Sequence, residues 1–232
     1  MTKIKNNDFI EIEYTGSLKD EGTVFDTTDK KAAEENGLDE NITDFGPIIV
    51  CVGENQILKG IDSFIEGKEP GEYEIDIKPE DGFGKKDAKM IQLIPTSKFK
   101  KQQITPVPGL QINIDGMIGT IKTVTGGRTI VDFNHPFSGR ELHYRIKVNR
   151  IVEDPVEQIK SLLYLKYQMK DPEITVEDTK ATISSDVPKE LQDMIKEDIT
   201  RLTKVKEVEF GKKTEKIKKE KDNESSKGVT NA

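Results

Sequence analysis

The sequence predicts an α+β fold, and three observations support that prediction. Residues 1 to about 152 contain several short segments with β-type alternation, separated by glycines. Among these segments, the stretch 55–67 has the apolar spacing of a short amphipathic helix. Beyond Asp154 and Pro155, longer helical spacings take over. An antiparallel sheet around one short helix, followed by a separate α/β unit, satisfies all three observations.

The predicted sheet begins with "NDFIEIEYTG", in which apolar side chains alternate with acids as in a half-buried strand. The run "PIIVCVG" is typical of a buried strand, and "EYEIDI" alternates again before a turn. The helix at 55–67 ends at Gly67. Five apolar side chains would share one face of it: Ile57, Leu58, Ile61, Phe64 and Ile65.

Residues 85–139 predict a second, all-β domain. The β-type pattern continues through "GLQINIDGMIGTIKTVTGGRTIVDF", and both Asp115-Gly116 and Gly126-Gly127 are hairpin-turn signals. The section also begins with its own proline-bearing stretch, "QLIPTSKFKKQQITPVPG". We therefore expect a small β domain with its own core.

Residues 154–210 predict an α/β domain. Pro155 suits the first position of a helix, and two amphipathic helices enclose a strand or hairpin and precede a last strand. About 60 residues is close to the lower limit for independent folding. A homodimer through the two helices and a self-contained accessory domain are therefore equal alternatives. Residues 211–232 carry seven lysines against four acids and little apolar mass, which predicts a disordered tail.

Composition limits the function classes. The net charge of −7 argues against a general nucleic-acid binder, although a local basic patch is compatible with it. The chain has no apolar run of membrane-spanning length, and its first residues lack a signal-peptide core, so we expect a cytoplasmic protein with no membrane partner. With one cysteine, Cys51, in an apolar run and two histidines, His135 and His143, we expect neither a metal nor another cofactor.

Four motifs, in order along the chain, carry a family resemblance. "FIEIEYTGSLKDEGTVFDTT", "VGENQILKGIDSFIEGKEPGE", "IKPEDGFG" and "LHYRIKVNRI" each match a segment of one family. Together they resemble the FKBP-type peptidyl-prolyl cis-trans isomerases over residues 14–151. The resemblance implies an FKBP-like antiparallel sheet that wraps the short helix, and a prolyl isomerase activity.

The gap of about 60 residues between Phe83 and Tyr144 also has a counterpart in this family. It resembles the insert-in-flap domain of SlyD-like members, whose insert ends in a signature similar to "NHPFSGRELHY" here. The resemblance implies a discontinuous isomerase domain at 1–84 plus 140–153 and an insert-in-flap chaperone domain at 85–139. The total length and the third domain point to the long archaeal type.

The same resemblance implies a pocket for the proline-containing peptide. Its lining would be Tyr14, Phe25, Ile48, Ile57, Leu58, Ile61, Phe83 and Tyr144. Asp26 would lie at the rim, and the backbone N–H of Leu58 would hold a substrate carbonyl. Two positions depart from the family pattern: Ile61 stands where tryptophan is common, and Phe83 lacks a hydroxyl. Each residue alone would be assigned to an ordinary core or turn.

Two functions follow. The first is an isomerase and folding chaperone that acts on unfolded or partly folded proline-containing polypeptides. The alternative, motivated by Phe83 and Ile61, is a weakly catalytic or non-catalytic holdase. In both, a subset of the insert's apolar residues would form a client groove, although most could equally form its core. The candidates are Ile91, Leu93, Ile94, Phe99, Ile104, Val107, Leu110, Met117 and Ile118.

Overall fold

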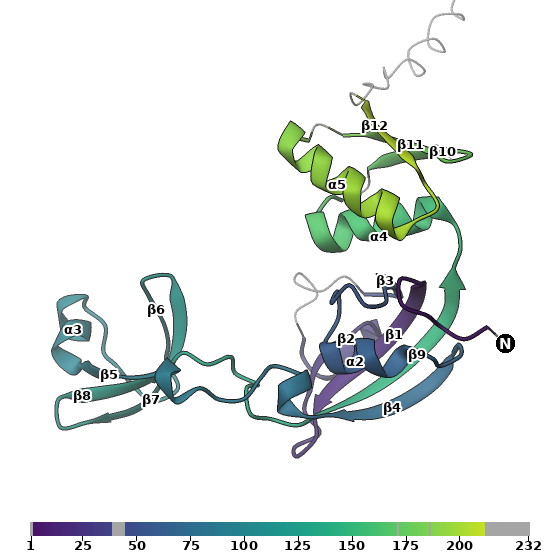
Figure 1. Cartoon of the computed structure of the whole chain (residues 1–232). Coiled ribbons are helices and arrows are strands. Elements are labelled where there is room, and N and C mark those ends of the chain that lie inside the picture. The colour runs from purple at the N-terminus through teal and green to yellow at the C-terminus, as the bar shows by residue number, and fades with distance from the viewer. Residues whose placement is uncertain (1, 39–44, 171, 186, 212–232) are drawn as a thin grey trace, which may run out of the picture. The chain divides into compact units, whose positions relative to one another are not determined.

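The computed structural model describes residues 2–38, 45–170, 172–185 and 187–211. The predicted disordered tail therefore lies, apart from Gly211, outside the described residues. Within these ranges the chain forms two compact units, which divide between Val152 and Glu153 (Figure 1). The first unit contains two separate antiparallel sheets, and the second contains a small mixed sheet with two helices.

The main sheet of the first unit has five strands, and the strand after the insert lies in its centre. Its order is β2-β1-β9-β4, and β3 pairs with the other half of β1. All pairings are antiparallel. The strands are β1 (Phe9–Leu18), β2 (Val24–Thr27), β3 (Ile48–Cys51), β4 (Gly71–Ile77) and β9 (Leu142–Val152). The mixture of sheets and few helices agrees with the predicted α+β class.

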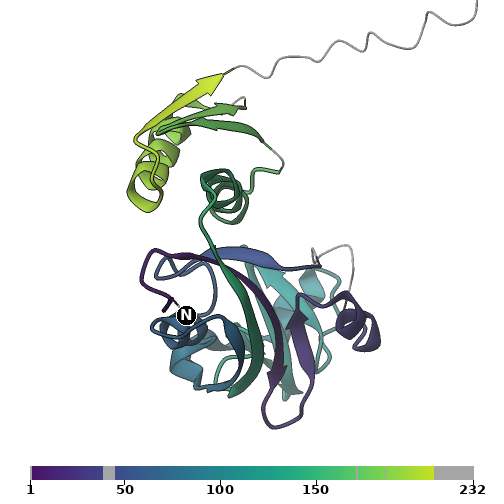
Figure 2. The same ribbon diagram turned by 90° about the vertical axis from the view of Figure 1, so that its right-hand side faces the viewer.

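A short helix, α2 (Lys59–Ile65), covers the inner face of this sheet. Ile61 and Ile65 on α2 are buried, and both views show α2 against the curved sheet (Figures 1 and 2). A Cβ at Gly60 would lie 2.7 Å from Cγ2 of Ile77, so the close approach of α2 to β4 requires a glycine there. The short 3₁₀ helix η1 (Pro79–Asp81) then leads out of β4.

Charged side chains in rows occupy the outer face of the same sheet. Lys147 on β9 pairs with Glu13 on β1 at 3.7 Å, and Nδ1 of His143 lies 2.9 Å from Asp76 on β4. Exposed pairs of this kind contribute little stability, but opposite charges on neighbouring strands favour this register over a shifted one. Helix α1 (Lys30–Glu35) follows β2, with the Asp29 carboxylate as its N-cap.

The insert forms a four-stranded sheet of its own, in the order β5-β8-β7-β6. The elements are η2 (Ala88–Met90), β5 (Ile91–Pro95), α3 (Thr96–Lys101), β6 (Gln111–Ile114), β7 (Met117–Thr125) and β8 (Arg128–Asp132). Asp115-Gly116 and Gly126-Gly127 all have positive φ, as the predicted hairpin turns require. The core consists of Ile94, Phe99, Ile112, Ile121, Val131 and Phe133. Helix α3 within this section was not predicted.

Hydrogen bonds join the two crossings between the sheets. The Asn134 side chain accepts from the Asp87 N–H at 2.8 Å and donates to the Asp87 carbonyl at 3.0 Å. The Ser138 hydroxyl donates to the Phe83 carbonyl at 2.9 Å. These bonds explain the polar residues in "NHPFSG" as contacts that hold the outgoing and returning chains together. We define the neck as residues 83–87 and 134–139.

The second unit has two helices and a three-stranded sheet of order β10-β11-β12. Its elements are α4 (Pro155–Tyr167), β10 (Glu173–Glu177), β11 (Lys180–Ser184), α5 (Lys189–Leu202) and β12 (Glu207–Gly211). Asp154 caps α4 by accepting from the Val156 N–H at 3.0 Å, and Pro155 occupies the first turn as predicted. Within the described ranges, every helix is too short or too polar to cross a membrane.

Candidate active site

Four aromatic residues from distant parts of the sequence meet at the inner face of the main sheet. The rings of Tyr14 on β1 and Tyr144 on β9 have centroids 6.0 Å apart, and Phe25 on β2 lies 6.0 Å from Tyr144. Phe83, just after η1, lies 5.8 Å from Phe25. The contacts are edge-to-face or tilted, which is the favoured geometry for such rings. The structure therefore brings together the four aromatic residues that the sequence assigned to a pocket.

The predicted lining residues fall into two groups by burial. Tyr144 and Ile61 are each 2% exposed, so they suit a buried floor. The other predicted lining residues are half-buried, as walls with one open side would be: Tyr14, Phe25, Ile48, Ile57, Leu58 and Phe83. Leu58 is the N-cap residue of α2, and its N–H has no hydrogen-bond partner in the part of the chain that the structure describes. It is therefore available to a ligand carbonyl.

Two further rings join the cluster from the neck, and the sequence did not indicate them. Phe137 lies 4.5 Å from Phe25 and 5.4 Å from Phe83. His135 stacks on Phe83 with ring centroids 4.3 Å apart. Its Nδ1 also accepts from the Phe137 N–H at 3.2 Å, so this ring has both a local hydrogen bond and a stacking partner in Phe83. We define the aromatic cluster as Tyr14, Phe25, Phe83, His135, Phe137 and Tyr144.

Comparison with known proteins matches this arrangement to one family. Residues 1–101 match the model of the FKBP-type peptidyl-prolyl cis-trans isomerases, and residues 92–137 match the model described as "FKBP26, IF domain". The short-type peptidyl-prolyl cis-trans isomerase of Methanocaldococcus jannaschii is 33% identical over 149 residues, which cover 64% of this chain and 94% of that protein. The chain belongs to the FKBP-type peptidyl-prolyl cis-trans isomerases.

SlyD proteins are also similar to this isomerase. SlyD of Haemophilus influenzae is 31% identical over 118 residues, which are 49% of this chain and 62% of that protein. Among solved structures, the three FKBP domains of wheat FKBP73 match 66% of this chain and 42% of that chain, at 15% identity and a TM-score of 0.35. That score is too low for the two structures to be compared in detail.

A carboxylate lies beside the aromatic cluster of the isomerase. Asp26 is half-buried and accepts a hydrogen bond from the Tyr14 hydroxyl. Burial raises the pKa of Asp26, although the bonds from Tyr14 and from the Thr27 backbone oppose that effect. Burial, together with the nearby Asp26 charge, raises the pKa of Tyr14 well above its usual value. The Tyr14 hydroxyl therefore stays protonated, and it acts as a donor.

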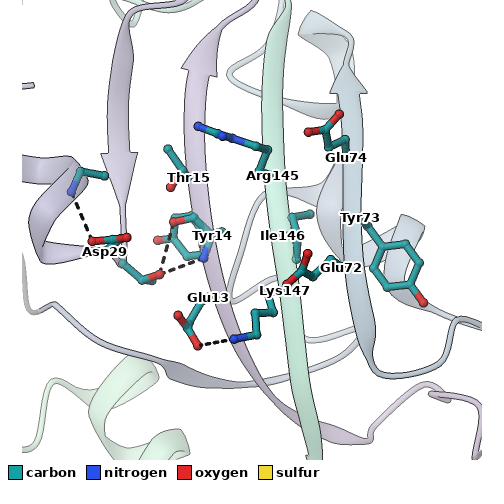
Figure 3. A pocket seen from close by; sticks show the side chains of 12 residues that line it. Glu13, Tyr14, Thr15, Asp29, Glu72, Tyr73, Glu74, Arg145, Ile146 and Lys147 are labelled. Atoms are coloured by element: carbon teal, nitrogen blue, oxygen red, sulfur yellow. Dashed lines mark hydrogen bonds and ion pairs between the residues drawn. The ribbon is translucent and has the colours of Figure 1, made fainter.

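A hollow of about 520 Å³ also lies on the main sheet, and Tyr14 is the member of the aromatic cluster that contributes to its lining. Glu13, Arg145 and Lys147 line it and alternate along their strands with Tyr14 and Tyr144, so they face the other side of the sheet. Figure 3 shows Arg145 reaching from β9 toward β1, and the ion pair between Glu13 and Lys147. This hollow belongs to the charged outer face, and its open, polar lining does not suit an apolar peptide.

The nine insert residues predicted to bind clients divide into two groups. Ile94 and Phe99 are buried in the insert core, and Ile104 and Leu110 pack against it. These four residues therefore belong to the core of the insert, which is one of the two alternatives that the sequence leaves open for its apolar residues. The other five are exposed by 43–66%: Ile91, Leu93, Val107, Met117 and Ile118. In the ranges that the structure describes, no group of three or more His, Cys, Asp or Glu residues is placed to hold a metal ion.

Gly16→Ala should impair catalysis through Tyr144. Gly16 lies opposite Tyr144 in the sheet, and a Cβ there would come within 2.6 Å of the Tyr144 ring. The ring must move, so we expect kcat/KM to fall about fivefold, with a stability loss of about 1 kcal/mol from overpacking. A tetrapeptide isomerisation assay measures the first effect, and thermal unfolding the second.

Gly71→Ala is the matched control for this substitution. A Cβ at Gly71, on β4 of the same sheet, would have its nearest contact at 3.6 Å, which is an ordinary van der Waals distance. We expect its kcat/KM to stay within about twofold of the parent. Equal losses of activity in the two variants would show that the Tyr144 contact is not the cause.

Proposed function

We propose that this isomerase rotates X-Pro bonds over the aromatic cluster and holds unfolded segments of the same client on the insert. The observation that supports the proposal is the position of Phe137. It belongs to the chain that returns from the insert, yet its ring lies 4.5 Å from Phe25 in the pocket. A pocket built partly from the neck links the catalytic site and the insert through covalent structure.

The chemistry needs an apolar pocket rather than a nucleophile. Amide resonance sets a barrier of about 18–20 kcal/mol for rotation about the peptide bond. The half-rotated amide has lost this resonance and is less polar than the planar one. Apolar surroundings therefore favour the twisted state relative to water. Tyr144 and Ile61 would contact the proline ring, and the Leu58 N–H would hold a neighbouring carbonyl.

Tyr14 and Asp26 would orient the substrate in this mechanism. Because Tyr14 donates to Asp26, the carboxylate holds the hydroxyl in place at the pocket rim. The rotation transfers no proton, so no general acid is required. Phe83 offers no hydroxyl to the substrate, and catalysis would therefore depend on ring contacts from Phe83 and Phe137.

One face of the insert sheet suits an unfolded client. The face opposite to the insert core carries four aliphatic side chains by cross-strand register: Ile91, Leu93, Ile118 and Ile130. We call these four side chains the aliphatic row; Ile91, Leu93 and Ile118 are exposed, and exposed apolar side chains on one face can mark a binding site. The row begins on β5, an edge strand that pairs with β8 on one side only. An extended client could add to this edge and place alternate side chains on the row.

A client held on the insert would meet the pocket at high effective concentration. This tethering would compensate for a modest rate on short peptides. The neck hydrogen bonds from Asn134 and Ser138 support such a role, because they limit how freely the two crossings can separate.

An insert deletion that preserves the neck tests this proposal. Two glycines replace residues 88–133 and join Asp87 to Asn134. The Asp87 backbone and the Asn134 side chain are already hydrogen-bonded to each other. Phe137 and the pocket stay intact. We expect tetrapeptide isomerisation to be retained within about threefold, while catalysis of a proline-limited refolding reaction and suppression of aggregation are largely lost.

The same measurements distinguish the proposed function from the alternative, a holdase with little or no catalysis. A full chain that suppresses aggregation without accelerating either assay at micromolar concentration would be a holdase. If the deletion left refolding catalysis unchanged, the insert would not hold clients for the isomerase site. Loss of tetrapeptide activity in the deletion variant, with its far-UV circular dichroism otherwise intact, would mean that the insert itself shapes the pocket.

A further inference from the structure

The insert has the opposite charge from the domain that carries it. Residues 85–139 contain eight lysines and arginines and three aspartates. The rest of the first unit, residues 1–84 and 140–152, contains 22 acidic and 12 basic residues. A client that approaches this protein therefore meets an insert of net positive charge and an isomerase domain of net negative charge.

The positive charge is concentrated at one end of the insert sheet. Helix α3 carries Lys98, Lys100 and Lys101, and all three are exposed. Its start is fixed to the turn between β7 and β8, because the Thr96 N–H donates to the Gly127 carbonyl at 2.9 Å. Arg128, the first residue of β8 after this turn, is also exposed. We define the basic end as Lys98, Lys100, Lys101 and Arg128, and Figure 1 shows α3 at this end of the insert.

The basic end lacks partners of its own. None of its four side chains forms an ion pair or hydrogen bond with any residue that the structure describes. The segment 88–114 contains no acidic residue at all. Unpaired cations that share one end of a small domain repel each other, so an anionic ligand that bridges them would bind favourably.

The basic end is continuous with the aliphatic row. Arg128 precedes Ile130 by two residues on β8, so both project to the same face, and Ile130 lies directly opposite Leu93. An extended chain along this face would pass from the aliphatic contacts at Leu93 to Arg128. If it continued past this end of the sheet, it would meet the lysines of α3, which packs on the core side through Phe99.

We propose that the insert selects unfolded segments in which an apolar stretch is flanked by acidic residues, with the acids at the basic end. This inference rests on the proposed client-holding function and specifies its substrate class. RNA fits the surface less well, because non-specific RNA binding uses exposed aromatic rings as stacking platforms. The aromatic residues of the insert are Phe99 and Phe133, which are buried, and His135 and Phe137, whose rings pack in the aromatic cluster.

Fluorescence anisotropy with two labelled peptides tests the selection. Both carry the same proline-free apolar core, so the pocket does not contribute, and their flanks are four glutamates or four lysines. At low salt we expect the full chain to bind the glutamate-flanked peptide about tenfold more tightly. The preference should shrink as ionic strength rises, because exposed charges are screened.

A triple charge reversal locates the effect. Lys98→Glu, Lys100→Glu and Lys101→Glu together should abolish the preference for the glutamate-flanked peptide. The corresponding glutamine triple should reduce this preference, and it controls for misfolding caused by the added negative charge. The control is Lys160→Glu, Lys189→Glu and Lys204→Glu, which changes the net charge equally on exposed positions outside the insert. The control triple should retain the preference.

The outcomes are distinct. Equal binding of both peptides would overturn the selection while leaving client holding intact. Binding of neither peptide would overturn the selection together with client holding by the insert. Tighter binding of an oligouridylate than of the glutamate-flanked peptide, lost in the same triple variant, would identify the basic end as an RNA site and also overturn the proposal.

Discussion

Phe25→Ala should lower kcat/KM for prolyl isomerisation by about 10- to 100-fold. Phe25 contacts three other rings of the cluster, at 4.5 Å from Phe137, 5.8 Å from Phe83 and 6.0 Å from Tyr144. Each such contact is worth about 0.5–1.5 kcal/mol beyond area burial. Loss of about 1.4–2.8 kcal/mol from the transition state corresponds to the stated range.

Phe64→Ala is the matched control for Phe25→Ala. Phe64 is also a half-buried phenylalanine of the isomerase domain, but its ring pairs with Tyr73 at 5.8 Å and takes no part in the aromatic cluster. It should lose comparable stability and keep kcat/KM within about threefold. If both variants lost activity in proportion to stability, the aromatic cluster would be a folding core and not the place of catalysis.

The residues that the sequence could identify are those inside ordered motifs. Tyr14, Phe25, Phe83 and Tyr144 lie at fixed places in segments that resemble one family, and the structure brings their rings together. Phe137 differs, because its segment resembles only the signature that ends the insert and not a motif of the pocket. The neck sequence has no periodicity that would identify Phe137 as part of the pocket. The position of Phe137 depends on hydrogen bonds between segments about 50 residues apart, such as the bond from Ser138 to Phe83.

Exposure within the insert could not be predicted for a similar reason. Ile94 and Leu93 are neighbours of the same chemical type, yet Ile94 is 9% exposed and Leu93 is 56% exposed. Alternation indicates that they face opposite sides of a strand, but not which side is covered. The deciding element is α3, a six-residue helix whose Phe99 enters the core. A helix this short has too few residues to show a periodicity.

Asp198→Ala should destabilise the second unit by about 2 kcal/mol. Asp198 on α5 is 7% exposed and accepts from the Tyr167 hydroxyl, from Lys166 at 2.6 Å and from Arg201 at 2.9 Å. A hydrogen bond to a charged group contributes about 1.5–3 kcal/mol. The expected loss of stability is smaller than that of three such bonds. Lys166 and Arg201 are each more than 40% exposed, so water can hydrate them when the carboxylate is removed.

The effect of Asp198 should also depend on pH. Burial opposes ionisation, but the bonds from Lys166, Tyr167 and Arg201 outweigh it and lower the pKa of Asp198 below its usual value. A carboxyl whose pKa is lower in the folded state stabilises the fold above its unfolded pKa of about 3.9 and loses that contribution as the pH falls through the folded value. The difference in stability between the variant and the parent should therefore be largest at pH 7 and should shrink as the pH falls below about 4.

Hydrogen exchange of the α4 and α5 amides in the full chain, corrected for intrinsic rates, measures this difference within the second unit. Asp193→Ala is the control, since Asp193 is exposed on the same helix. It should change exchange by less than about 0.5 kcal/mol at either pH. If Asp198→Ala and Asp193→Ala behaved alike at pH 7, the ion cluster would be a surface feature. If their difference persisted unchanged into acid, side-chain packing rather than charge would hold α4 against α5.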